Sequence, residues 1–96
     1  MSDKNNGFLK RADAHIALAN EQMSEDLTQG EISASFMYAA SRFNAWIAAC
    51  SFESKEDMKA EKAEVVDYFM KEYKLALEEH LDHHIEHYDF SQNQAK

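Results

Sequence analysis

The sequence predicts an all-α fold, a three-helix up-down bundle with a long C-terminal helix. The 96-residue chain contains no proline and two glycines, whereas a sheet protein with several tight turns ordinarily needs more of both. Apolar residues recur at spacings of three and four along three segments, which is the period of one helical face. We expect a single helical domain over 1–96, because a chain of this length has room for one core.

The first helix is expected over residues 8–27. Its apolar stripe consists of Phe8, Leu9, Ala12, Ile16, Ala19, Met23 and Leu27. Gly30 is expected to end this helix, because glycine adopts the left-handed conformation without a steric cost. Residues 1–6 are expected to fray, as chain termini commonly do.

The second helix is expected over residues 32–51, and it is the least charged of the three. Its core stripe consists of Phe36, Ala39, Ala40, Phe43, Trp46, Ile47 and Cys50. The opposite side carries mostly small residues. A helix that is apolar or small nearly all round is usually buried on more than one side, so we expect it to be the central helix.

Arg42 is the only charged residue between Ser33 and Phe52. A buried arginine needs a carboxylate partner, so we expect a buried ion pair with an acid from another helix. An anion-binding site for a ligand is the alternative. In the ion-pair interpretation, removing the guanidinium would cost about 3–5 kcal/mol.

The third helix is expected over residues 55–88, with Ser54 and Asp57 forming an approximate capping box at its start. Its stripe consists of Val66, Phe69, Met70, Tyr73, Leu77, Leu81, Ile85 and Tyr88. At 1.5 Å per residue this helix is roughly 50 Å long, whereas the other two are each roughly 30 Å. Its end is therefore expected to extend beyond them unless it is kinked, and residues 90–96 are expected to fray.

Three apolar residues near that end, Leu81, Ile85 and Tyr88, form the predicted interface. Monomers rarely leave a contiguous apolar stripe exposed, and self-association would bury it.

Charge and cysteine content limit the partners and the compartment. The net charge is −8, with 18 acidic against 10 basic residues, which argues against nucleic acid and against an anionic membrane surface. Cys50 is the only cysteine, so no intramolecular disulfide can form, which suits a reducing cytoplasm. We expect a cytoplasmic protein whose partner is another protein or a second copy of itself.

Four of the five histidines fall within eight residues: His80, His83, His84 and His87. On a helix they lie within roughly 100° of its circumference, and the i,i+4 pairs can share zinc, nickel or copper. They are weak candidates, because a structural zinc site needs four ligands and no other Cys or His clearly completes one. The favoured interpretation places His84 on or near the core face and the other three at its border beside acidic residues, and a proton switch is a further alternative.

No arrangement of residues indicates catalysis. The sequence has no nucleophile beside a base, no paired catalytic acids and no glycine-rich phosphate loop. We expect neither an enzyme nor a bound cofactor.

Two stretches carry a family resemblance: Ile-Ser-Ala-Ser-Phe-Met-Tyr-Ala-Ala-Ser-Arg-Phe-Asn-Ala at 32–45 and Glu-His-Leu-Asp-His-His-Ile-Glu-His-Tyr-Asp at 79–89. They resemble a small family of uncharacterised proteobacterial proteins of about this length, which has no assigned function. His80 and His87 stand where that family more typically has asparagine. The resemblance implies a bacterial, cytoplasmic protein and supplies no substrate, cofactor or catalytic residue.

The leading hypothesis is a small helical interaction module that acts through self- or hetero-association. The alternative is a metal- or pH-responsive element built on the four histidines.

Overall fold

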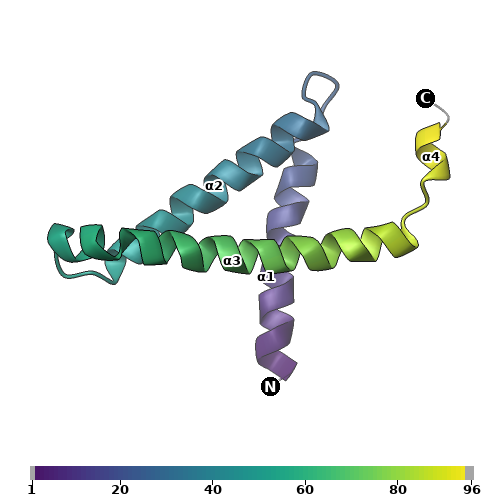
Figure 1. Cartoon of the computed structure of the whole chain (residues 1–96). Coiled ribbons are helices and arrows are strands. Elements are labelled where there is room, and N and C mark those ends of the chain that lie inside the picture. Colours follow the sequence, from purple (N-terminus) through teal and green to yellow (C-terminus); the bar gives the residue numbers. More distant parts are fainter. Residues whose placement is uncertain (1, 95–96) are drawn as a thin grey trace. The chain divides into compact units, whose positions relative to one another are not determined.

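The computed structural model describes the backbone of residues 2–94 and the side chains of residues 7–91 and 93. Within those residues the chain is helical, with no strand: α1 (Ser2–Glu21), α2 (Gln29–Cys50), α3 (Lys55–His87) and the short α4 (Ser91–Gln94) (Figure 1). The predicted all-α class is confirmed, and the long C-terminal helix has 33 residues. The chain divides after Cys50 into two units, 1–50 and 51–96, which are described in turn.

The first unit is a helical hairpin whose first helix lies earlier in the chain than predicted. It begins at Ser2, so residues 2–6 are helical, and residue 1 lies outside the described residues. It ends at Glu21, six residues before the predicted end at Leu27. Ser24 explains the early end: its Oγ accepts a hydrogen bond from the Asp26 N–H at 3.2 Å, and its carbonyl accepts one from the Leu27 N–H at 3.3 Å. These local bonds replace helical ones.

A capping box starts α2, and it also corrects the prediction for Gly30. Thr28 Oγ1 accepts a hydrogen bond from the Glu31 N–H at 3.1 Å, while Glu31 Oε1 accepts one from the Thr28 N–H at 2.8 Å. Two backbone donors at the helix start are thereby satisfied. Gly30 lies in the first turn of α2 and its φ is not positive, so it does not end α1.

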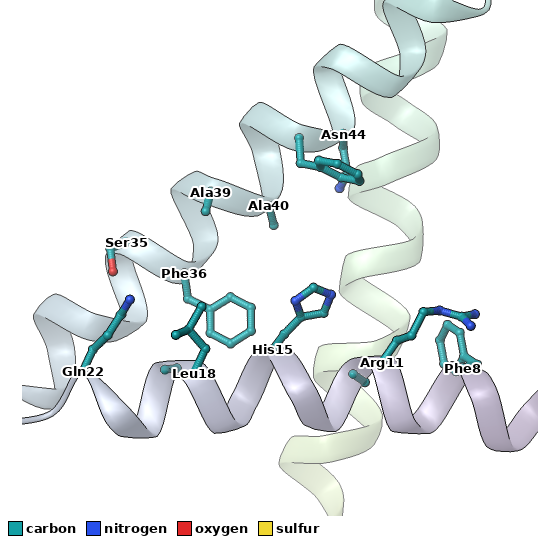
Figure 2. A pocket seen from close by; sticks show the side chains of 13 residues that line it. Phe8, Arg11, His15, Leu18, Gln22, Ser35, Phe36, Ala39, Ala40 and Asn44 are labelled. Atoms are coloured by element: carbon teal, nitrogen blue, oxygen red, sulfur yellow. The ribbon is translucent and has the colours of Figure 1, made fainter.

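The two helices of the hairpin diverge from their connecting segment (Figures 1 and 2). Ile32, close to that connection, is buried at 5% exposure and is the one buried apolar side chain among those described. Farther along α2 the predicted core residues are open: Phe36 is 38% exposed and Phe43 is 59% exposed. The hairpin thus presents an apolar inner face.

The second unit consists of α3 and the turn that follows it. Ser54 caps α3 as predicted, because its Oγ accepts a hydrogen bond from the Asp57 N–H at 3.1 Å. The helix then continues without interruption to His87, one residue before the predicted end.

The described end of the chain contains a helical turn that was not predicted. Asp89 Oδ1 accepts hydrogen bonds from the N–H and the hydroxyl of Ser91, at 3.1 and 2.6 Å, and a helical turn begins there. Fraying was predicted for residues 90–96, but 91–94 are helical, and 95–96 lie outside the described residues.

Candidate functional site

A groove of about 830 Å³ lies between α1 and α2, within the first unit. Figure 2 shows the two helices facing each other across it, with Gln22 and Ser35 at its narrow end and Phe8, Arg11 and Asn44 where it opens. Its apolar lining consists of Phe8, Ala12, Leu18, Ala19, Phe36, Ala39, Ala40 and Phe43. Small residues at the middle of α2 leave the space, and the aromatic rings form its walls.

The groove is basic. Arg11 and His15 are its two titratable lining residues, and no acidic side chain lines it. They are four residues apart on α1, so they lie on the same side of the helix. An apolar groove with basic and without acidic groups favours an occupant that is apolar and negatively charged.

The face of α1 that lines the groove coincides with the predicted stripe only in part, because Phe8, Ala12 and Ala19 belong to both. Arg11, His15, Leu18 and Gln22, which also line it, follow one another at spacings of three and four and are centred roughly 105° from the centre of that stripe. Ile16, assigned to the predicted stripe, does not line the groove. This second helical pattern is present in the sequence, but it consists mostly of polar residues, so the spacing of apolar residues alone does not predict it.

The polar groups that line the groove form no nucleophile–base pair among the described residues. The hydroxyl of Ser35 donates to the Ile32 carbonyl at 2.9 Å, so it is engaged by its own helix rather than by an imidazole. His15 is the groove's one side chain of a type that commonly acts as a general base, and no lining carboxylate is present to orient it.

The predicted interface on α3 is an exposed apolar surface. Leu81 is 52%, Ile85 is 69% and Tyr88 is 42% exposed. Further apolar residues continue the stripe toward the start of the helix: Val66, Met70, Tyr73 and Leu77. The α3 stripe, as this set of seven residues is called below, runs along most of a helix about 50 Å long.

The structure brings three of the four histidines into ring contact, with His83 and His87 as the nearest pair. The ring centroids of His83 and His87 are 4.7 Å apart, and His84 makes edge contacts with His83 at 5.6 Å and with Tyr88 at 6.1 Å. His80 makes no ring contact with these residues in the described part of the chain. All four side chains are exposed, which differs from the expected position at the border of a core.

Arg42 does not occupy the predicted buried ion pair. It is exposed, and its guanidinium carbon lies 5.6 Å from the centroid of the Tyr38 ring, one turn earlier on α2. The ring supplies a cation–π contact in place of a carboxylate. The salt bridge found among the described side chains joins Lys74 and Glu78, 3.8 Å apart on the surface of α3.

Two further features are absent from the described residues. No group of three or more His, Cys, Asp or Glu side chains there is arranged to hold a metal ion. None of the helices combines the length and apolar character that crossing a membrane would require.

Comparison with known proteins identifies the family. The chain is similar to the protein NB7890A from Shewanella sp., whose NMR structure shares 44% sequence identity with it, covers 93% of this chain and 94% of that one, and superposes with a TM-score of 0.75. No curated protein matches. A family model matches residues 8–85, so the chain belongs to the family described as protein of unknown function (DUF3144).

Proposed function

We propose that the protein is a self-associating helical module, in which the groove between α1 and α2 of one copy binds the C-terminal half of α3 from a second copy. The observation that carries the proposal is the match in chemistry between two surfaces of the same chain. One is an apolar groove with a basic lining, and the other is an exposed apolar stripe on an acidic helix. An amphipathic helix seated in an apolar groove is a common mode of protein recognition.

Charge supports this occupant. Between Lys74 and Lys96 the sequence has no Lys or Arg and carries five acidic residues: Glu78, Glu79, Asp82, Glu86 and Asp89. The apolar residues of this half, Leu77, Leu81 and Ile85, lie among them. Arg11 and His15 of the groove would face negative charge on either side of the inserted stripe, which favours this pairing over an uncharged helix.

The length of α3 relative to the hairpin helices is compatible with binding by a second copy of the chain. The hairpin helices contain 20 and 22 residues, so each is about 30–33 Å long, whereas α3 reaches about 50 Å. A surface of the hairpin's length covers about two thirds of α3 at most. The third of α3 that lies beyond such a surface is open to a second copy of the chain.

Protein binding is favoured over nucleic-acid binding and over catalysis. A net charge of −8 disfavours nucleic acid, and the groove lacks a paired acid and base. A cytoplasmic location is part of the proposal, supported by the single cysteine.

The test is the oligomeric state of the wild type and of Leu81→Asp/Ile85→Asp, measured by analytical ultracentrifugation over a range of concentrations. We expect the wild type to dimerise as its concentration rises and the double variant to remain monomeric, because each aspartate would carry a charge into the groove. Circular dichroism establishes that the variant stays helical.

Ala76→Asp is the matched control. It introduces the same side chain on the same exposed helix, rotated by about 140° from Leu81, and it should dimerise like the wild type. A wild type that remains monomeric at every concentration would overturn the proposal. Equal loss of dimer in Ala76→Asp would show that added charge alone, and not the α3 stripe, is responsible.

A further inference from the structure

The geometry points to a two-histidine site for a late divalent transition-metal ion at the C-terminal end of α3, formed by His83 and His87. This inference is independent of the proposed self-association, because both ligands belong to one helix of one chain.

The ring separation carries the argument. A cation held by an imidazole nitrogen at about 2.0–2.1 Å lies about 3.2 Å from the ring centre, so two imidazoles at right angles around one ion have ring centres about 4.5 Å apart. The centroids of His83 and His87 are 4.7 Å apart, with the ring planes at 42°. This spacing matches that of adjacent ligands on a single ion once a nitrogen of each ring faces it, and it needs no change in the helix.

The backbone holds this spacing. α3 is helical through His87, and the N–H of Tyr88 donates to the His84 carbonyl at 2.9 Å, which closes the last turn. Both ligands are exposed, so an ion has free access to them.

The class of ion follows from the donor set. Imidazole nitrogen suits copper, nickel and zinc, whereas magnesium and calcium prefer oxygen ligands. Since no third ligand is arranged beside the pair in the described residues, water would complete the coordination. Nickel and copper, which accept ligands at right angles, fit this arrangement better than a four-ligand structural zinc site. The acidic residues 78, 79, 82 and 86 would attract any cation to this end of the helix.

The test is titration of the untagged full chain with NiCl₂ by isothermal titration calorimetry, with NMR to locate the site. We expect binding of one ion per chain and paramagnetic broadening centred on residues 83–87. His83→Gln should weaken binding by about tenfold or more, because the second nitrogen binds as part of a chelate and gains a high effective concentration.

Two controls make the result specific. His80→Gln removes a histidine from the same stretch but leaves the pair intact, and it should bind nickel as the wild type does. Excess MgCl₂ should not displace the nickel, since the acidic side chains alone would prefer magnesium. Equal weakening in His80→Gln and His83→Gln, displacement by magnesium, or wild-type binding no tighter than that of His83→Gln would each overturn the inference.

Discussion

At the scale of single residues, Arg42 and Tyr38 make a contact within one helix that either residue can lose at small cost. The guanidinium lies 5.6 Å from the ring centroid on the surface of α2. Exposed cation–π contacts contribute about 0.5–1 kcal/mol, whereas breaking a buried ion pair costs about 3–5 kcal/mol. We therefore expect Arg42→Met to lower the free energy of unfolding by at most about 1 kcal/mol.

Urea unfolding of Arg42→Met, Tyr38→Leu and the double variant measures this contact. The two single losses should sum to more than the double loss, because both remove the same interaction. A decrease of several kcal/mol in the free energy of unfolding of Arg42→Met would instead support the buried ion pair predicted from the sequence.

Glu61 is a second residue with a testable role, because its surroundings change its pKa and thereby the pH dependence of stability. A hydrogen bond with the Glu64 side chain raises the pKa of Glu61 above its ordinary value of 4.5, and the nearby charges of Glu64 and Asp57 act in the same direction. The folded chain then binds this proton at a higher pH than the unfolded chain does. Glu61 should therefore contribute stability at pH below 4.5 that is lost as pH rises through the raised pKa.

We expect Glu61→Gln to flatten the pH dependence of stability just above pH 4.5, a small effect because the group is exposed. Urea unfolding at closely spaced pH values measures it. Glu72→Gln, which removes a carboxylate elsewhere on α3, is the control. If both variants keep the wild-type slope, the coupling between Glu61 and Glu64 is absent in solution.

At the scale of the helices, local polar contacts decide where each one begins and ends. The start of α3 could be predicted from the sequence because Ser54 and Asp57 stand at capping positions, and its course could be predicted because no breaker follows. The end of α1 could not, because the bonds at Ser24 compete with an apolar pattern that continues to Leu27. Thr28 and Glu31 have the spacing of a capping box and could have predicted the start of α2, but Gly30 was interpreted as the end of α1.

The capping box at Thr28 gives a prediction for α2. Thr28→Ala should lower the free energy of unfolding by about 0.5–2 kcal/mol, because the Glu31 N–H loses its acceptor at the helix start. Thr28→Ser keeps the hydroxyl and should stay close to the wild type. Chemical unfolding followed by circular dichroism compares the two. Equal stability of the alanine and serine variants would mean that this cap is not formed in solution.

At the scale of the whole molecule, the groove could not be predicted from the sequence. Its volume depends on how far α1 and α2 diverge, which no local pattern specifies, and its basic members stand outside the apolar stripe. The apolar stripe that contains Leu81, Ile85 and Tyr88 could be predicted from residue spacing, and its role as an interface stays a prediction. An apolar stripe on one helix is therefore easier to predict from the sequence than a groove that forms between two helices.

Arg11 allows a test of this receiving surface. In the proposed dimer its guanidinium faces the acidic side chains of α3 from a second copy, so Arg11→Glu replaces attraction with repulsion. We expect the dissociation constant to rise by about fivefold, which corresponds to about 1 kcal/mol for a solvent-exposed charge. Added salt should also raise the dissociation constant of the wild-type dimer, because ions screen exposed charges beyond about 10 Å at 0.1 M.

Lys10→Glu is the matched control for Arg11→Glu, because it makes the same change in charge one residue earlier at a side chain that does not line the groove. Sedimentation equilibrium at two salt concentrations compares the three proteins. If the groove receives the acidic helix, Lys10→Glu stays close to the wild type, and added salt no longer weakens the Arg11→Glu dimer. Equal weakening by the two variants would mean that net charge controls association, and the dimer contact would then have to lie away from the groove.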